Sequence, residues 1–510
     1  MTNSQIIWVL VSFVVYMGMM ITIGALYMKK TSSSEDYFLG GRGLGAWVAA
    51  LSAQASDMSG WMLMGLPGAV YAFGTGQAWI AVGLLAGTIL NWIFVSGRLR
   101  KYTIKANNSL TLPSFFENRF HDKKRILLTT SSVVIVIFFL VYTASAFSAG
   151  GKLFQTVFGV DYRAALTIGA AVILIYTFMG GFMAVCVTDF IQGLLMLVGV
   201  LAIPIIAFFL LGGTGNLQAL LESSGVSGGS ASFLSLLESG GRPYTAMEIF
   251  SQVAWGFGYF GMPHILIRFM AVRDDKEIKK SKWVAIIWCT LSLTFACLIG
   301  VIGRAYFSPN VLENSENVFI EMIKKVFMSD LSIPLIGGLF LCGILAAIMS
   351  TADSQLLVTA SAVSEDIYHK IIRPKADNKK VLLVSRVTVL AVAVIAYIIA
   401  LDPDNSIMGL VSNAWAGFGS AFGPLVLLSL YWKRTNLPGA VAGIVSGALT
   451  VIVWDYIPLA NGQTLGSATG LYSLALGFLI SLVLIILVSV STKAPDKDIM
   501  NEFESVQKEG

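Results

Sequence analysis

The sequence predicts an all-α polytopic membrane protein with about thirteen transmembrane helices. Of its 510 residues, 56% are hydrophobic and only 12% are charged, whereas a soluble domain carries about 25% charged residues. The apolar residues form stretches close to the roughly 20 residues that a helix needs to cross the hydrocarbon core. Two of these stretches contain Gly and Pro residues that interrupt a helix. Interrupted spans in corresponding halves of a chain are typical of transporter binding sites.

The predicted spans follow one another with short polar loops between most of them. The first has no basic residue before it and Lys29-Lys30 after it. That is the wrong polarity for a cleaved signal peptide, so we predict a retained span. The approximate limits of the stretches are 5–28, 43–73, 76–97, 126–150, 164–181, 187–212, 246–266, 283–303, 332–361, 381–401, 406–432, 437–457 and 468–491.

The basic residues predict the orientation in the membrane. When successive loops are assigned to alternate sides, 28 of the 34 Lys and Arg residues fall on one side. Because cytoplasmic loops carry an excess of Lys and Arg, we expect the N-terminus outside and the C-terminus in the cytoplasm. The six residues on the other side are Lys152, Arg163, Arg242, Arg304, Lys324 and Lys325.

The two broken spans also predict an internal repeat. Spans two to six open with one broken span and spans seven to eleven with the other, and because the offset of five is odd, the second unit is inverted. A short amphipathic piece is expected at 233–237, and the polar end from Asp496 is expected to be disordered. The predicted units are 1–42 (first span and cytoplasmic loop), 43–212 (first five-helix repeat), 213–245 (extracellular loop), 246–432 (second repeat), 433–491 (two C-terminal spans) and 492–510 (cytoplasmic tail).

Catalytic motifs are absent from the sequence. There is no Walker A motif and no spacing typical of a Ser-His-Asp triad or a metalloprotease. The four cysteines all fall within apolar stretches and have no metal-ligand spacing. We therefore expect a protein that is not an enzyme, and a membrane enzyme is the least favoured function class.

Asp57 is the most informative single residue. An ionisable group within a span costs a few kcal/mol, so it faces a cavity or a partner. It is flanked by Ser56 and Ser59, in a span that Gly60 and Pro67 loosen. We interpret Asp57 as a residue for cation binding or coupling. A carboxylate that caps a half-helix is the alternative, and the two roles are compatible.

Span nine carries small and hydroxylated residues on one helical face, followed by Asp353. The i, i+3, i+4, i+7 spacing places four residues there: Ala347, Ser350, Thr351 and Ser354. Hydroxyls in a helix often donate only to the carbonyl four residues earlier. Hydroxyls beside the free carbonyls of an unwound helix, however, suit Na+, a hard cation that prefers oxygen ligands. A transition-metal site would require clusters of His or Cys, which the sequence lacks.

Span seven combines aromatic residues with glycines. Trp255 and Tyr259 are four residues apart, which in an α-helix places both rings on one face. The glycines of 256–261 let backbone approach a ligand closely, and Pro263 predicts a break. Amides at a half-helix N-terminus suit a carboxylate and an aromatic face suits an ammonium, so together they describe an amino-acid zwitterion. Packing in the core or against lipid is the alternative for either ring.

Two further charged residues lie near predicted span ends. Arg42 follows two glycines at the cytoplasmic mouth of span two, where simple anchoring is the alternative to a functional role. The glycines of 40–45 precede a spanning helix rather than joining a strand to a helix, so we reject a dinucleotide-binding loop. Asp189 lies near the start of span six, and we expect it to cap that helix, with a place along the transport pathway as the alternative.

Several longer strings, in this order, carry a family resemblance: GGR at 40–42, ASDMSGW at 55–61, GLPGA at 65–69, Tyr142, GFGYFG at 256–261, AAIMST at 346–351, SED at 364–366 and NAWAGFG at 413–419. They resemble the solute:sodium symporter family, most closely its sodium/proline members. The resemblance implies a leucine-transporter-like core of ten helices in two inverted five-helix repeats, with one extra helix before and two after. It also implies sodium-coupled uptake of L-proline across the plasma membrane by alternating access.

The resemblance further implies the site residues. Na+, the co-transported ion, would bind the carbonyls of Ala55, Met58 and Ala347 and the hydroxyls of Ser350 and Thr351. L-proline would contact Ser59, Trp61, Tyr142, Trp255, Tyr259 and Pro263. Asp57 would matter for sodium affinity and Arg42 for coupling. Membrane lipid surrounds such a protein, and neither a nucleic acid nor an obligate protein partner is implied.

Three residues depart from the pattern expected of proline transporters. Gln54 replaces a glycine, Met262 replaces a glutamine and Asp353 replaces a small residue. Because Met262 removes a polar side chain near the substrate, pantothenate, a sugar or a short carboxylate is the alternative solute. Asp353 predicts either a second cation site or a solvated acid. A channel or a sensor is a further alternative, although sensors usually append a signalling domain and only 492–510 follow the last span.

Overall fold

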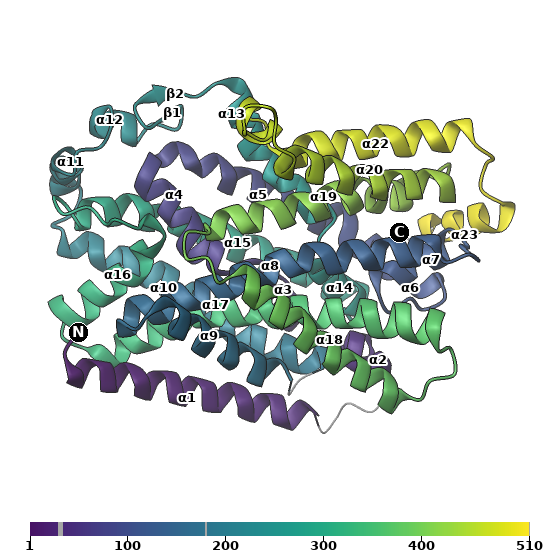
Figure 1. Cartoon of the computed structure of the whole chain (residues 1–510), viewed down its shortest axis with the longest axis horizontal. Coiled ribbons are helices and arrows are strands. Elements are labelled where there is room, and N and C mark those ends of the chain that lie inside the picture. Colours follow the sequence, from purple (N-terminus) through teal and green to yellow (C-terminus); the bar gives the residue numbers. More distant parts are fainter. Residues whose placement is uncertain (29–33, 179–180, 509–510) are drawn as a thin grey trace.

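The computed structural model describes residues 1–28, 34–178 and 181–508. Most of its long helices run roughly along the longest axis of the molecule, side by side in one bundle (Figure 1). The Lys29-Lys30 pair that follows the first predicted span lies outside the described residues. The all-α prediction is confirmed, because the only named strands among the described residues form one two-stranded hairpin, β1 (Glu238–Ser239) with β2 (Arg242–Pro243).

Ten helices of the described chain are long and apolar enough to span a membrane. One is a run over Thr75–Lys105, which contains α5 (Ala78–Leu90), η4 (Asn91–Val95) and α6 (Ser96–Lys105). The others are α1 (Asn3–Met28), α8 (Ile126–Phe158), α10 (Phe182–Leu210), α15 (Asp275–Tyr306), α17 (Pro334–Ser361) with its continuation η8 (Ala362–Ile372), α18 (Asn378–Ile399), α19 (Ile407–Tyr431), α20 (Leu437–Tyr456) and α22 (Ser473–Ser491).

The three remaining predicted spans are short or interrupted. Span two divides into α3 (Ala46–Asp57) and α4 (Leu66–Phe73), with a π-helical turn between them. Span seven divides into α13 (Ala246–Val253), the 3-10 helix η5 (Ala254–Phe260) and α14 (Pro263–Ala271). Span five is α9 (Tyr162–Thr177). Both predicted breaks are therefore confirmed.

Shorter helices lie near the ends of the bundle. They are α2 (Ser34–Leu39), η1 (Gly40–Arg42), α7 (Leu112–Arg119), α11 (Thr214–Ser223), α12 (Gly229–Phe233), α16 (Val318–Lys324), α21 (Leu465–Thr469) and α23 (Lys497–Lys508). The amphipathic piece expected at 233–237 is wrong, because α12 ends at Phe233. The disordered tail is also wrong. In α23 the apolar side chains of Ile499, Phe503 and Val506 are spaced at helical intervals and are buried against the bundle.

The two broken spans lie in the interior, where helices approach closely. α3 packs against α10, α15 and α17, and α17 is buried along nearly its whole length. α5 touches η5 backbone to backbone, since a Cβ at Gly87 would lie only 2.2 Å from the carbonyl oxygen of Gly256. A larger side chain at either glycine would separate these two elements.

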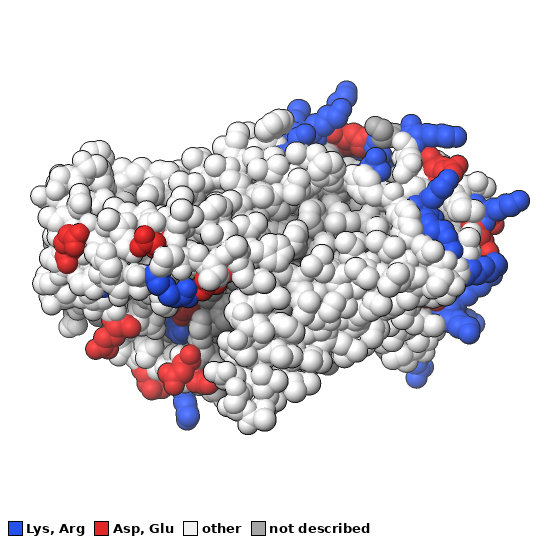
Figure 2. Space-filling view, turned by 90° about the horizontal axis from the view of Figure 1, so that it is seen from above, with Lys and Arg blue, Asp and Glu red and all other residues white. Residues whose placement is uncertain are grey.

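Charged residues gather at the two ends of the molecule and leave an apolar belt between them (Figure 2). Most Lys and Arg residues lie at the end formed by α6, α7, the start of α15 and α23, which we call the basic end. Arg268 is an exception. It is one of the 28 basic residues predicted to lie on the cytoplasmic side, but it lies in α14 with only 1% of its surface exposed.

Candidate ion and substrate site

The break in span two releases backbone carbonyls from helical pairing. α3 ends at Asp57, and Met58 has a non-helical backbone (φ −82°, ψ 73°). The N–H of Ser59 donates to the carbonyl of Asp57 (3.0 Å) instead of to Ala55 four residues back. Gly60 is needed here because a Cβ would lie 2.8 Å from the Cβ of Ala149. The carbonyl of Ala55 is thus available to another partner.

That partner comes from α17. Ser350 Oγ donates to the carbonyl of Ala55 (2.7 Å) and lies 3.2 Å from the carbonyl of Ala347. Three predicted sodium ligands therefore meet in one buried cluster. Thr351 Oγ1 is buried next to Ser350 and has no hydrogen-bond partner among the described residues. Met58 lies in the break, and no hydrogen bond joins its carbonyl to this cluster.

All donor atoms of this cluster are neutral oxygens. Hydroxyl and carbonyl oxygens suit a hard monovalent cation. The Thr351 hydroxyl has no hydrogen-bond partner among the described residues, so its oxygen is available as a ligand. No group of three His, Cys, Asp or Glu residues that could hold a metal lies within the described ranges.

The carboxylate of Asp57 connects the two broken spans. Tyr259 Oη, from η5, donates to Asp57 Oδ2 (2.5 Å), while Oδ1 is buried without a partner. Trp61 Nε1 donates to the main-chain carbonyl of Asp57 (2.9 Å). The capping alternative for Asp57 is wrong: it is the last residue of α3, and no described backbone N–H donates to its side chain.

Two aromatic side chains near Asp57, those of Tyr142 and His264, carry polar atoms that are buried. Tyr142 Oη is completely buried near Ser59 and Trp61 and makes no hydrogen bond with a described residue. The ring of His264 lies edge-on to Tyr142, with 6.1 Å between ring centroids, and neither ring nitrogen has a described partner. Unpaired donors and acceptors in a dry interior are costly, and a polar ligand bound in this region would satisfy them.

Span seven places its aromatic rings differently from the prediction. In the 3-10 helix η5, residues four apart point about 120° away from each other. Trp255 stacks on Tyr472 (5.1 Å, 24°), whereas Tyr259 meets Trp415 edge-on (5.1 Å, 86°). The single shared face was expected from α-helical geometry, and it is not formed. Pro263 begins α14 directly after the break at Gly261 and Met262, as predicted.

Trp415 fixes the position of η5. Its Nε1 donates to the carbonyl of Trp255 (2.8 Å). A Cβ at Gly258 would lie 2.0 Å from that same nitrogen, so only glycine fits. The indole of Trp415 thus contacts both Trp255 and Tyr259, the two aromatic residues predicted to contact the substrate in span seven.

A second buried polar cluster lies beside the first. Arg268 donates to Asp189 Oδ2 (3.2 Å) and to Ser354 Oγ (2.5 Å). Asp189 Oδ2 also accepts from Ser52 Oγ (2.7 Å). The capping role expected for Asp189 is wrong, because α10 begins at Phe182 and places Asp189 two turns inside the helix.

Asp353 lies in the same region and is completely buried. The solvated-acid interpretation is therefore wrong, and the second-cation interpretation stays a prediction. Asp353 Oδ1 accepts only a long hydrogen bond from Ser354 (3.4 Å), and Oδ2 has no described partner. Asp189 is thus the carboxylate that pairs with Arg268 (3.2 Å), and Asp353 forms no ion pair with a described residue.

Arg42 joins three segments at the basic end. Its guanidinium donates to the carbonyls of Met270 (2.6 Å) and Ser109 (3.0 Å) and to Asn108 Oδ1 (2.9 Å). Burial lowers the pKa of Arg42 to about 10, which still leaves it charged at neutral pH. Because Met270 lies in the last turn of α14, Arg42 connects the segment before span two to the end of span seven.

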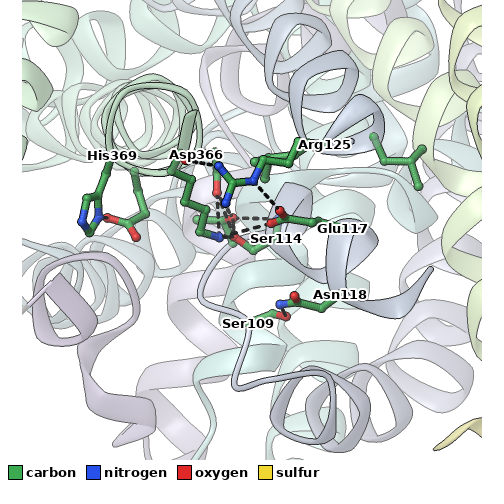
Figure 3. Close-up of polar contacts among 12 residues, drawn as sticks. Ser109, Ser114, Glu117, Asn118, Arg125, Asp366 and His369 are labelled. Atoms are coloured by element: carbon green, nitrogen blue, oxygen red, sulfur yellow. Dashed lines mark hydrogen bonds and ion pairs between the residues drawn. The ribbon is translucent and has the colours of Figure 1, made fainter. Parts of the chain in front are cut away.

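The helix that carries Ser350 is fastened at the basic end. Its continuation η8 carries the buried Asp366, which accepts hydrogen bonds from Thr111 and Ser114 (2.8 Å each). Arg125 pairs with Glu117 of α7 (3.2 Å), in the group of side chains that Figure 3 draws between these elements. Movement of α17 at this end requires these contacts to change.

Sequence reasoning missed three residues of this region: His264, Arg268 and Trp415. Two of them follow Pro263 in the broken span, and a charged or titratable residue within a span is itself a functional signal. Trp415 stands in the NAWAGFG string, where composition alone gives no reason to prefer it to other aromatic residues.

Comparison with known families decides the class of protein. A model described as "Sodium:solute symporter family" matches residues 37–447. The chain belongs to the sodium:solute symporter family. It is therefore a multi-pass membrane transporter and not an enzyme, and Na+ is its coupling ion.

Several characterised relatives are similar over nearly the whole chain of this symporter. The high-affinity proline transporter PutP of Bacillus subtilis is 44% identical over 490 residues, 96% of this chain and 99% of the relative. The sodium/proline symporter of Escherichia coli is 44% identical over 500 residues, 97% and 95% of the two chains. The osmoregulated proline transporter OpuE of Bacillus subtilis is 42% identical over 502 residues, 98% of each chain.

Solved structures establish the fold of the symporter. A substrate-bound, outward-open Na+-coupled sialic acid symporter matches with a TM-score of 0.77 at 19% identity, over 96% of this chain and 98% of that one. The nucleobase-cation-symport-1 transporter Mhp1, in a closed conformation with bromovinylhydantoin bound, matches with a TM-score of 0.57 at 13% identity, over 93% and 99%. The leucine-transporter-like fold predicted from the sequence is confirmed.

Proposed function

We propose that this symporter couples the inward movement of Na+ to the uptake of L-proline by alternating access. The substrate rests on one observation: relatives named as proline transporters share 42–44% identity with nearly the whole chain. Coupling to sodium fits the buried cluster of neutral oxygens at the first break.

The sodium site is proposed on two helices. Its ligands are the carbonyls of Ala55, Met58 and Ala347 and the hydroxyls of Ser350 and Thr351. The Ser350 hydroxyl now donates to Ala55 (2.7 Å). A bound cation would turn that hydroxyl so that its oxygen faces the ion, and the unpartnered Thr351 hydroxyl would gain a role. Asp57 is proposed to raise sodium affinity through its negative charge nearby.

The substrate site is proposed beside the sodium site. Its contacts are Ser59, Trp61, Tyr142, Trp255, Tyr259 and Pro263. Free amides at the break suit the carboxylate of a zwitterion, and the aromatic rings suit its pyrrolidine ring and ammonium. Tyr259 also donates to Asp57 (2.5 Å). This hydrogen bond joins a substrate contact to the residue that raises sodium affinity, so it couples binding at the substrate site to binding at the sodium site.

The orientation and the transport cycle follow from this assignment. We propose that the basic end faces the cytoplasm and that both units, 43–212 and 246–432, move relative to each other as inverted repeats of a chain in the plasma membrane. Sodium entering from outside would order the break in span two and complete the substrate site. The contacts of Arg42 and Asp366 would change when the site opens inward.

The driving force is sufficient for this function. A potential of 100 mV contributes about 2.3 kcal/mol per charge, and a tenfold sodium gradient adds about 1.4 kcal/mol. The total of about 3.7 kcal/mol allows roughly 500-fold accumulation for each sodium moved.

Another small solute is the second candidate, because Met262 is completely buried at the second break and offers no polar side chain. Uptake of labelled L-proline into proteoliposomes under an imposed sodium gradient tests both candidates. We expect sodium-dependent uptake that excess pantothenate, sugars and short carboxylates do not inhibit. Inhibition by one of those solutes at lower concentration than by proline would favour the second candidate, and uptake without sodium would indicate a channel.

A further inference from the structure

A cavity of about 470 Å³ lies at the basic end of the molecule, apart from the ion and substrate site. It is formed where the first repeat, the second repeat and the C-terminal helix meet. Gly97 and Arg98 line it from α6, Lys279 from the start of α15, Tyr431 from the end of α19 and Val506 from α23. No part of the transport mechanism described above uses this cavity.

The cavity carries an excess of positive charge. Its lining includes Arg98, Lys101, Lys279 and Lys282 but one carboxylate, Asp275. Asp275 is already engaged by Arg100 (3.3 Å) and Lys101 (3.1 Å). Among the described residues, no carboxylate lies within 4.0 Å of Arg98, Lys279 or Lys282. These three cations therefore converge on the cavity without a counter-ion from the described chain.

The surface beside the cavity is apolar and aromatic. Ile93 and Phe94, one turn before Arg98, are 50% and 47% exposed, and Trp283 beside Lys282 is 61% exposed. Tyr431 donates from its hydroxyl to the carbonyl of Phe94 (2.7 Å) and carries the guanidinium of Arg98 over its ring (4.0 Å). Trp and Tyr concentrate at the level of lipid headgroups. The rim of the cavity thus combines aromatic rings of the kind found at headgroup level with exposed apolar surface.

We propose that this cavity binds the phosphate headgroup of an anionic phospholipid from the cytoplasmic leaflet. The orientation rests on the proposed function, but the chemistry does not. A phosphodiester supplies the missing negative charge, Arg98 and the lysines supply the donors, and the acyl chains lie along Ile93 and Phe94. Basic pockets between transmembrane helices on the cytoplasmic side bind such headgroups. Bound lipid would link α6, which contacts Arg42 through Thr103, to the start of α15.

Lipid retention by the purified full-length chain tests this proposal. The protein is equilibrated in detergent with equal amounts of phosphatidylglycerol and phosphatidylcholine, and the bound lipids are counted by native mass spectrometry. We expect the chain to retain phosphatidylglycerol in preference to phosphatidylcholine. Lys279→Gln with Lys282→Gln should weaken that retention about tenfold, since each Lys near an anionic headgroup contributes to binding.

Two further variants separate the cavity from general surface charge. Gly97→Leu keeps every charge but fills the cavity, because a Cβ at Gly97 meets only Ile278 Cγ2 (4.0 Å), and it should weaken retention as well. Lys379→Gln with Lys380→Gln removes the same charge from exposed positions on α18 and should leave retention unchanged. Equal retention of the two lipids by the unmodified chain, or loss of retention in the α18 control to the same extent, would overturn the proposal.

A water-soluble phosphate is the competing source of the same chemistry. Thermal unfolding is therefore followed with phosphatidylglycerol, sn-glycerol 3-phosphate or inorganic phosphate at equal phosphate concentration. We expect only the lipid to raise the unfolding temperature, because the exposed apolar rim contributes through the acyl chains. An equal shift with sn-glycerol 3-phosphate would overturn the lipid assignment. None of these measurements depends on proline uptake, so they fail or succeed independently of the proposed function.

Discussion

Ser350 donates a hydrogen bond of 2.7 Å to the carbonyl of Ala55, across 295 residues of sequence. That carbonyl has no helical hydrogen bond, because the N–H of Ser59 donates to the carbonyl of Asp57 instead (3.0 Å). One break in a helix of the first repeat thus creates the acceptor, and one hydroxyl of the second repeat occupies it. A cation bound here would take ligands from both repeats, so its affinity depends on how the repeats are packed.

We expect the double change Ser350→Ala with Thr351→Ala to raise the sodium concentration for half-maximal uptake by about tenfold or more. Each substitution removes one of the five proposed oxygen ligands, and a loss of about 1.4 kcal/mol is already tenfold. The measurement is initial uptake of labelled proline against sodium concentration. Ser361→Ala is the matched control, because that buried hydroxyl of α17 only donates to the carbonyl of Val358 (2.8 Å). An unchanged sodium dependence in the double variant would contradict the ion site.

Tyr259→Phe removes the donor to Asp57 and leaves the ring in place. A hydrogen bond to a charged group is worth about 1.5–3 kcal/mol, so we expect at least about a tenfold rise in the KM for proline, with reduced sodium affinity. Tyr162→Phe, which loses hydrogen bonds to the carbonyl of Ala400 (2.8 Å) and to Ser148 Oγ (3.4 Å) but none to Asp57, should leave both unchanged. If Tyr259→Phe raised neither quantity, the link between the two broken spans would be without function.

Asp189 and Asp353 should respond differently to neutralisation. Asp189→Asn breaks the buried pair with Arg268, which costs about 3–5 kcal/mol. Asp353→Asn removes a carboxylate that no described residue pairs with, so we expect a much smaller change in thermal unfolding. The ratio of labelled sodium to labelled proline taken up tests the second-cation prediction, and the same ratio in Asp353→Asn and the unmodified protein would contradict it.

Arg42→Lys should reduce coupling while keeping the charge. A Lys ammonium cannot reproduce the planar fork that reaches Met270, Ser109 and Asn108 together. We expect a lower maximal rate of uptake and more sodium-independent leak of proline, both measured in proteoliposomes. Arg273→Lys is the control, because its side chain is 60% exposed and pairs only with neighbouring acids. Equal leak in the two variants would argue against a role of Arg42 in coupling.

The helix that leads into η5 should depend on its cap. Glu248 forms the capping box of α13 with Thr245 and also pairs with Arg242 (2.5 Å). Glu248→Ala removes both contacts, and loss of a cap typically costs about 1 kcal/mol of helix stability. We therefore expect amide hydrogen exchange in α13 to become faster in this variant. Unchanged exchange in α13 would show that the capping box does not stabilise the helix.

Local patterns in the sequence were sufficient for much of the fold. Hydropathy locates the spans because every lipid-facing helix must be apolar over a fixed length. The breaks follow from Gly60, Gly261 and Pro263, because these residues act on the backbone within one turn. The oxygen-rich face of span nine follows from helical spacing. The same reasoning failed for η5, because a 3-10 helix changes the direction of side chains without changing the residue types.

The sequence by itself determined where the helices run, where two of them break and which residue types line those breaks. Only the tertiary structure decided which of these residues meet: Ser350 with Ala55, Tyr259 with Asp57 and Arg268 with Asp189. It also decided that α23 is a packed helix, since Phe503 is buried against Tyr102 of α6 (6.3 Å between ring centroids). Helix propensity and hydropathy are properties of neighbours in sequence, whereas a site shared by two repeats depends on packing between segments hundreds of residues apart.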